Sequence, residues 1–73
     1  MEKYLLFISN TCHKCPQAKE VIKDKNVLII NCSEEEGLKK AREYDVTQVP
    51  TLISLTKVFR ASDIEDIKNE MQN

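Results

Sequence analysis

The sequence predicts an α/β fold whose elements follow in the order β-α-β-α-β-β-α. Two short apolar runs, at residues 4–8 and 27–32, flank a segment with helical periodicity. This is the pattern of a β-α-β unit with parallel strands and a right-handed crossover. A mixed four-stranded sheet with helices on both faces would bury every apolar run. Because 73 residues suffice for one small domain, we expect a single domain over residues 1–73.

The first β-α-β unit depends on apolar runs that are too short for helices. Residues 4–8 are continuously apolar, as expected of a strand that is buried on both faces. Residues 27–32 form a similar run, rich in β-branched side chains, which predicts the second strand. Between them, residues 14–25 form an amphipathic helix of about three turns, because apolar residues recur at the i, i+3, i+4 spacing as Ala18, Val21 and Ile22.

The second helix is expected to begin with a capping box. Residues 33–36 combine a serine with acidic side chains in the first turn, which is typical of a helix N-terminus. The helix should run to about Tyr44, with Leu38 and Ala41 facing inward. Gly37 is the only glycine of the chain, and inside a helix it should cost about 1 kcal/mol relative to alanine.

The last three elements are two strands and a helix. Residues 51–56 alternate apolar and polar side chains with period two, as in a half-buried strand. Residues 57–60 are expected to form a short fourth strand, paired with the third through a tight turn. A second capping box at residues 62–65 begins the final helix, which presents three apolar residues on one face: Ile64, Ile67 and Met71.

Composition excludes several classes of function. The 11 basic and 12 acidic side chains nearly balance, so the chain lacks the positive charge of a nucleic-acid-binding protein. The first apolar run is too short for a signal peptide, and no stretch approaches the ~18 apolar residues of a membrane span. We expect a cytoplasmic monomer without a membrane partner. In the cytoplasm thiols stay reduced, and the odd number of three cysteines fits a disulfide scaffold poorly, so the context favours functional cysteines over structural disulfides.

Cys12 and Cys15 carry the main functional prediction. Two cysteines separated by two residues, at a strand-to-helix junction, indicate first a thiol–disulfide redox site and second half of a metal site. Zinc needs four ligands, and the other candidates are His13 and Cys32. Because His13 lies between the two cysteines, it fits the same tetrahedron poorly. We therefore predict no metal, and a metal-binding or chaperone-like module remains the alternative.

The chemistry assigns different roles to the two cysteines. Cys12 is expected to attack, because the N–H groups and the positive end of a helix dipole favour its thiolate. Cys15, one turn later, would resolve the mixed disulfide, and no cofactor is required. His13 and Lys14 can carry positive charge beside the sulfur and should lower the pKa of Cys12. Cys32 is expected to be a small buried apolar residue, with a regulatory or extra resolving thiol as the alternative.

Two motifs give the chain a family resemblance. The segment Cys12-His13-Lys14-Cys15 follows the first strand, and Val49-Pro50 precedes the third. Together with the element order, they resemble the minimal thioredoxin fold and are similar to glutaredoxins and glutaredoxin-like small redoxins. The resemblance implies that Pro50 is cis and close to the cysteine pair. It also implies that the backbone of Val49 offers hydrogen bonds to an extended partner segment.

The resemblance also indicates where substrates dock and where the chain departs from its relatives. Docking residues implied by it are Thr11, Val49, Pro50, Ser62 and Asp63. Thioredoxins carry Trp and Asp where this chain has Thr11 and Leu6. Glutaredoxins usually carry Tyr between the cysteines and a Gly-Gly pair before the last helix, both absent here. Ser62 and Asp63 are the residues available to the α-amino group of glutathione.

The expected activity is the reduction of a protein disulfide. Phe59-Arg60, followed by Asp63, is similar to the small redoxins that reduce ribonucleotide reductase and are recharged by thioredoxin reductase. The leading prediction is therefore an electron donor to a protein disulfide, such as that of ribonucleotide reductase. The alternative within the class is a glutathione-linked enzyme with glutathione as co-substrate.

Overall fold

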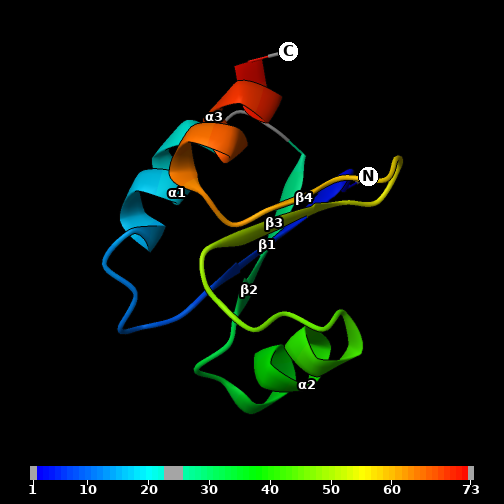
Figure 1. The fold of residues 1–73 in the computed structure, drawn as a ribbon. Helices are drawn as coiled ribbons and strands as arrows, with labels where there is room; N and C mark the ends of the chain where they lie inside the picture. Colours follow the sequence, from blue (N-terminus) through cyan, green and yellow to red (C-terminus); the bar gives the residue numbers. More distant parts are fainter. Residues whose placement is uncertain (1, 23–25, 73) are drawn as a thin grey trace.

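The structure, a computed structural model, describes residues 2–22 and 26–72. Within these residues, four strands form one sheet: β1 (Tyr4–Ile8), β2 (Val27–Asn31), β3 (Thr51–Ser54) and β4 (Arg60–Ala61). Their order across the sheet is β2-β1-β3-β4. β1 is parallel to β2 and antiparallel to β3, and β4 is antiparallel to β3 (Figure 1). The predicted element order and the mixed sheet are confirmed.

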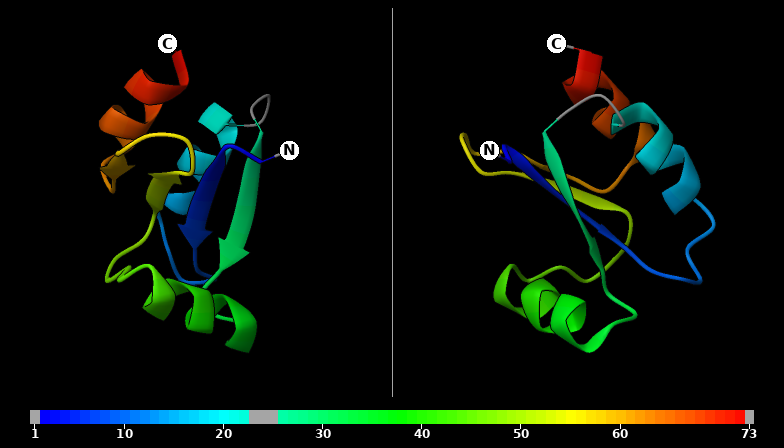
Figure 2. Two further views of the ribbon diagram at one scale, coloured as in Figure 1. Left: turned by 90° about the vertical axis from the view of Figure 1, so that its right-hand side faces the viewer. Right: turned by 180° about the vertical axis from the view of Figure 1, so that it is seen from behind.

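Helices cover both faces of this sheet. In the described part of the chain these are α1 (Cys15–Ile22), α2 (Glu35–Glu43) and α3 (Ile64–Gln72). α1 and α3 pack against each other on one face, and α2 lies on the opposite face (Figure 2). Within residues 2–22 and 26–72, no helix is long and apolar enough to cross a membrane.

β1 contributes to both hydrophobic cores, which explains its continuous apolar run. Successive side chains of a strand face opposite sides of the sheet. Leu6 and Ile8 therefore join a core beneath α1 and α3, whereas Leu5 and Phe7 join a core beneath α2. The prediction that this strand is buried on both faces is confirmed. Because β1 is held from both sides, its C-terminal end is a fixed point from which the following loop departs.

The other strands differ from expectation in burial and in their bounds. β3 was expected to be half-buried, but three of its four residues are buried, because it lies between β1 and β4 under both helical layers. The fourth strand is Arg60–Ala61 instead of 57–60. Residues 55–59 form the connecting turn, in which Ser54 Oγ accepts hydrogen bonds from the backbone N–H groups of Thr56 and Lys57. β2 ends at Asn31, one residue before the predicted end.

Both predicted capping boxes are wrong, because their serines make tertiary contacts instead. The N-cap of α2 is Glu34, and Ser33 Oγ accepts a hydrogen bond from the N–H of Asn10. At α3, Asp63 is the capping residue: its Oδ1 accepts from the N–H of Glu65 at 2.9 Å, and its carbonyl accepts from Ile67. Ser62 Oγ instead lies 3.0 Å from the hydroxyl oxygen of Thr51 in β3.

α2 packs on the sheet through its small residues. Ala41 is buried as predicted, but Leu38 is 42% exposed, so its expected inward position is wrong. Gly37 is buried, and a Cβ at this position would lie 1.8 Å from the carbonyl oxygen of Asn31. The glycine that the sequence presents as a weakness of the helix is therefore required by close packing.

The helix after the cysteine motif begins later than predicted. The carbonyl of Lys14 accepts a hydrogen bond from the N–H of Ala18, and regular helix runs from Cys15 to Ile22. Ala18 and Ile22 are buried in the core, and Val21 packs against it, which confirms the predicted apolar face. The last predicted turn includes residues 23–25, which lie outside the described residues.

Candidate functional site

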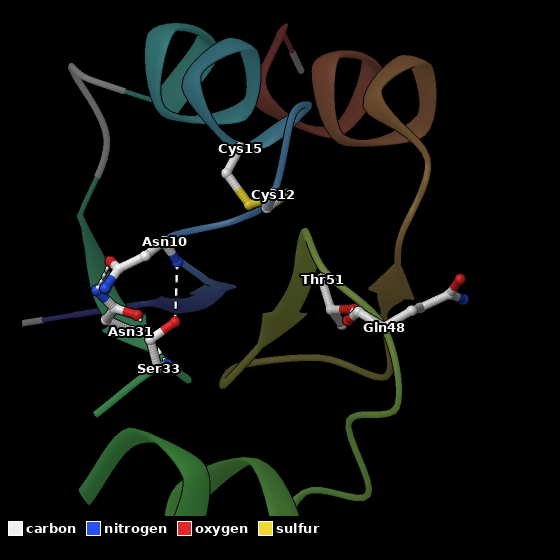
Figure 3. Close-up of a disulfide and its surroundings, with 7 residues drawn as sticks. All are labelled: Asn10, Cys12, Cys15, Asn31, Ser33, Gln48 and Thr51. Atoms are coloured by element: carbon white, nitrogen blue, oxygen red, sulfur yellow. Dashed lines mark hydrogen bonds between the residues drawn. A yellow bond between two sulfur atoms is a disulfide. The ribbon is translucent and has the colours of Figure 1, made fainter. Parts of the chain in front are cut away.

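The cysteine pair lies in a loop between the end of β1 and the start of α1. Cys12 and Cys15 are joined by a disulfide with their Cα atoms 5.4 Å apart (Figure 3). Within the loop, the N–H of Cys12 donates to the carbonyl of Ser9 at 3.4 Å. Cys15 is the first helical residue. The disulfide therefore connects a turn that follows the central strand to the first turn of a helix.

The two cysteines differ in exposure. Cys15 is 2% exposed and belongs to the core beneath α1 and α3. Cys12 is partly exposed and packs against the edge of the same core. Cys12 can therefore be contacted by a partner molecule, whereas Cys15 is shielded from solvent by the core. The expectation that Cys15 is the more buried of the two is confirmed.

The start of α1 places the sulfur pair at the positive end of a helix dipole. The helix begins three residues after Cys12, so only the bond to Cys15 holds the Cys12 sulfur at this end. Backbone N–H groups in a first turn have no partner within the helix, and they favour negative charge. Pro16 occupies a first-turn position, where its missing N–H is tolerated. That this end of α1 favours the Cys12 thiolate once the disulfide is reduced stays a prediction.

The other residues around the cysteines are exposed. Thr11, His13 and Lys14 are all exposed. Within residues 2–22 and 26–72, their side chains form no hydrogen bond, ion pair or ring contact. His13 and Lys14 are thus free to respond to a bound partner. Their role in tuning Cys12, and that of Thr11 in docking, stay predictions.

The Val49-Pro50 peptide bond is cis, as the resemblance implies. Pro50 is fully buried. Val49 is partly exposed and packs against both cores, one of which contains Cys15 and is also contacted by Cys12. Within the described residues, neither the N–H nor the C=O of Val49 takes part in a hydrogen bond. The role of these two groups in docking an extended partner segment, and the closeness of Pro50 to the cysteine pair, stay predictions.

Thr51, which sequence reasoning did not single out, fixes the segment around the cis bond. Its side chain is almost fully buried, and Oγ1 donates to the carbonyl of Gln48 at 2.6 Å. The same hydroxyl lies 3.0 Å from Ser62 Oγ. A polar residue directly after a proline, at the start of a buried strand, is the signal that could have indicated this role.

The predicted docking residues Ser62 and Asp63 line a cleft on the Thr51 side of the cis bond. Gln48, Thr51 and Arg60 are among its other lining residues. Arg60 Nη2 donates to the carbonyls of Tyr44 and Asp45 at 2.6 and 2.7 Å, so its guanidinium caps the end of α2. The structure thus brings Ser62 and Asp63 next to the segment that carries Pro50, whereas Thr11 belongs to the cysteine loop.

A second polar network, also missed by sequence reasoning, holds the loop before Cys12. Asn31 Nδ2 donates to Asn10 Oδ1 at 2.8 Å, and Asn31 Oδ1 accepts from the N–H of Ser33 at 2.9 Å. The N–H of Asn10 donates to Ser33 Oγ at 2.9 Å (Figure 3). The only sequence signal is the presence of short polar residues directly after two neighbouring parallel strands.

Cys32 lies at the same edge of the sheet, directly after β2. Its N–H donates to the carbonyl of Ile8 at 2.7 Å, and its side chain packs against the core beneath α2. It is not part of the disulfide. Burial raises the pKa of the Cys32 thiol, so this group is a weak nucleophile near neutral pH. The expected buried position is only partly met, because the side chain keeps some exposure.

The metal alternative finds little support in the geometry. Among the residues that the structure describes, no three side chains of His, Cys, Asp or Glu come together as metal ligands. A tetrahedral zinc site needs four ligands. Among the described residues, Cys12 and Cys15 thus have no third ligand beside them that would complete such a site.

Comparison with known proteins supports the same chemistry. A protein of Archaeoglobus fulgidus named "Probable Thioredoxin" is 41% identical to this chain over an alignment of 54 residues, with 66% of this chain and 59% of the relative covered. The chain thus spans about three fifths of the length of the curated relative it matches. No family model matches the sequence. The similarity, the Cys12–Cys15 pair and the mixed sheet with helices on both faces fit a small redoxin of thioredoxin-like fold.

Proposed function

We propose that this small redoxin of thioredoxin-like fold reduces a disulfide bond in another protein. A thiol redox function follows from the cysteine pair and from the similarity to a thioredoxin. The observation that carries the more specific proposal is the unequal burial of the pair. Cys15 is 2% exposed and Cys12 is partly exposed, so the two sulfurs can act in turn on one substrate.

The reaction has two exchange steps. The Cys12 thiolate attacks one sulfur of the target disulfide, a mixed disulfide forms, and the other target sulfur leaves as a thiolate. The Cys15 thiolate then attacks Cys12 Sγ, which forms the Cys12–Cys15 disulfide and releases the second target thiolate. The target gains two electrons and the protein loses two. Protons are taken from or returned to solvent, and the reaction requires no cofactor or metal.

The target docks as an extended segment along Val49. The backbone N–H and C=O of Val49 have no partner within the described residues, and both groups can pair with a strand-like peptide. Thr51 and Ser62 keep this edge in place through their hydroxyl contact. Thr11 and the cleft beside Ser62 and Asp63 would contact residues that flank the target disulfide.

We propose ribonucleotide reductase as the first target to test and a protein reductase as the recharging partner. The cleft that would receive glutathione is lined by Asp45, Asp63 and Asp66, and among its described lining residues Arg60 is the only basic one. Arg60 Nη2 is engaged with two backbone carbonyls. Because glutathione carries two carboxylates, these charges favour recharging by thioredoxin reductase. We place the reaction in the cytoplasm, where thiols are kept reduced.

A coupled reduction assay tests this function. Insulin, or the oxidised form of a ribonucleotide reductase, is incubated with catalytic protein and with either NADPH and thioredoxin reductase or NADPH, glutathione and glutathione reductase. We expect turnover with the first system to exceed turnover with the second. Cys12→Ser should abolish turnover in both. Absence of turnover with either system, or a stoichiometric zinc or copper ion in the reduced protein, would contradict the proposed function.

A further inference from the structure

The loop that carries Cys12 has one polar side-chain anchor to the rest of the described chain. Residues 9–14 connect β1 to α1. The side chains of Thr11, His13 and Lys14 form no polar contact within residues 2–22 and 26–72. Asn10 is the exception. Its N–H donates to Ser33, which follows β2, and its Oδ1 accepts from Asn31, the last residue of β2.

The anchor is a closed three-residue network. Asn31 Nδ2 donates to Asn10 Oδ1, Asn31 Oδ1 accepts from the N–H of Ser33, and Ser33 Oγ accepts from the N–H of Asn10. The three distances are 2.8, 2.9 and 2.9 Å. Each of the three residues is thus hydrogen-bonded to the other two. The network holds Asn10, which lies two residues before Cys12, in place (Figure 3).

The base of this network is rigid. Asn31 is the last residue of β2 and pairs in register with Ile8, the last residue of β1. Its carbonyl accepts from the N–H of Glu34, and Gly37 of α2 lies directly against the same carbonyl. Movement of Asn10 is therefore restrained by the sheet and by α2, although Cys12 belongs to neither.

We propose that Asn10, Asn31 and Ser33 are positioning residues that hold Cys12 beside Cys15 and thereby stabilise the disulfide form. This inference rests on the proposed function. The relevant equilibrium is the exchange of the protein dithiol with oxidised glutathione, in which the intramolecular Cys12–Cys15 bond forms and two molecules of reduced glutathione are released. Two electrons pass from the protein to oxidised glutathione in this step.

The sign of the effect does not depend on when the network forms. If the network also exists in the dithiol, it restricts the loop beforehand, and closing the disulfide then costs less conformational entropy. If the network forms only with the disulfide, its hydrogen bonds stabilise that form directly. Either way, breaking the network shifts the equilibrium toward the dithiol and makes the pair more oxidising.

The test measures the equilibrium of each variant with a series of glutathione redox buffers. Ser33→Ala removes the acceptor of the Asn10 N–H, and the double variant Asn31→Ala/Ser33→Ala removes the whole network. We expect the equilibrium constant for disulfide formation to fall about threefold in the single variant, as for a solvent-exposed hydrogen bond. In the double variant it should fall about tenfold, which corresponds to a potential about 30 mV less negative.

Two further variants separate positioning from general loss of stability. Ser54→Ala is the matched control, because Ser54 Oγ also accepts backbone N–H groups but lies opposite Tyr4, at the far end of β1. It should lower the free energy of unfolding and leave the equilibrium constant unchanged. Ser33→Thr keeps the hydroxyl and should retain the wild-type constant.

The outcomes distinguish this inference from the function on which it rests. A wild-type protein that equilibrates with glutathione buffers, together with network variants that share its constant or shift toward the disulfide, would overturn the positioning role alone. Equal shifts in Ser54→Ala and Ser33→Ala would overturn it as well. A wild-type pair that undergoes no reversible two-electron exchange would refute the proposed function itself.

Discussion

Gly37 of α2 lies against the carbonyl oxygen of Asn31, so closely that a Cβ would come within 1.8 Å of that oxygen and 2.5 Å of its carbon. The contact places α2 on the end of β2. The side chain of Asn31 in turn holds the loop before Cys12. A glycine in one helix thus supports the geometry of a redox site on another part of the sheet.

Gly37→Ala should therefore destabilise the protein, although alanine is the better helix former. The gain in helix propensity is about 1 kcal/mol, whereas the new methyl group must displace backbone rather than a flexible side chain. We expect a net loss of about 1–3 kcal/mol in the free energy of unfolding, as in other overpacked sites. Urea denaturation measures it. Glu36→Ala, at an exposed position of the same helix, is the control and should change stability by less than about 0.5 kcal/mol.

Tyr4 and Glu70 connect the start of β1 to α3, and their pKa values should move together. Hydrogen bonding to Glu70, with burial and charge repulsion, raises the pKa of Tyr4 to about 12. Hydrogen bonds from Lys57 and Tyr4 lower the pKa of Glu70; Lys57 Nζ lies 2.7 Å from Glu70 Oε2. Glu70→Gln should bring the pKa of Tyr4 back toward 10. The tyrosinate absorbance against pH, measured for wild type and for Glu70→Gln, reports this change, and Tyr4→Phe identifies the part of the signal that belongs to Tyr4.

Protein stability should follow the same two groups. Because the folded pKa of Tyr4 is raised, its contribution is complete below pH about 10 and is lost as the pH rises toward about 12. Because the folded pKa of Glu70 is lowered, its contribution is complete above its ordinary pKa and is lost as the pH falls through the folded value. A Glu70→Gln variant that keeps the wild-type dependence in both ranges would contradict the assignment.

Thr51→Val should destabilise the segment that carries the cis bond. The substitution keeps the shape but removes the hydroxyl that donates to Gln48 and contacts Ser62. The Gln48 carbonyl and the Ser62 hydroxyl lose this partner at a part-buried position. With about 0.5–1.5 kcal/mol for each hydrogen bond, we expect a loss of about 1–3 kcal/mol in the free energy of unfolding. Thr51→Ser keeps the hydroxyl and should lose less. Equal stability of Thr51→Val and wild type would show that these hydrogen bonds contribute nothing.

Cys32 should react slowly and should not be required for turnover. Burial raises the pKa of its thiol, and alkylation requires the thiolate. In the oxidised protein, iodoacetamide should modify Cys32 more slowly than it modifies free cysteine at pH 7, and unfolding should remove the difference. Cys32→Ser should retain wild-type turnover in the coupled assay. A large loss of turnover would instead support the regulatory or additional resolving role.

The sequence was sufficient where one local pattern determines the result. The burial of β1 on both faces of the sheet could be predicted from its continuous apolar run. The cysteine pair could be recognised from the spacing of Cys12 and Cys15 at a strand-to-helix junction. The cis bond before Pro50 came from the family resemblance. These features are local, or are shared with relatives, so no knowledge of distant contacts was needed.

Other features depend on contacts between distant residues. Ser33 and Ser62 have the sequence pattern of helix caps, but they bind Asn10 and Thr51 instead. Ser33 and Asn10 are 23 positions apart. The alternation in β3 suggested a half-buried strand. This prediction was wrong because the strand lies between β1 and β4, a position that cannot be inferred from its own residues. Gly37 shows the same limit, since the carbonyl that requires it belongs to another element.

In the proposed reaction, Cys12 attacks a protein disulfide and Cys15 resolves the mixed-disulfide intermediate. Replacing Cys15 should therefore trap that intermediate. Reduced Cys15→Ser protein is mixed with insulin or with oxidised ribonucleotide reductase, quenched with alkylating agent and digested for mass spectrometry. A stable mixed disulfide between Cys12 and the target is expected, with Cys32 alkylated. The Cys12→Ser variant is the control and should form no mixed disulfide. In Cys15→Ser, a mixed disulfide at Cys32, or the absence of one at Cys12, would contradict the proposed roles of the two cysteines.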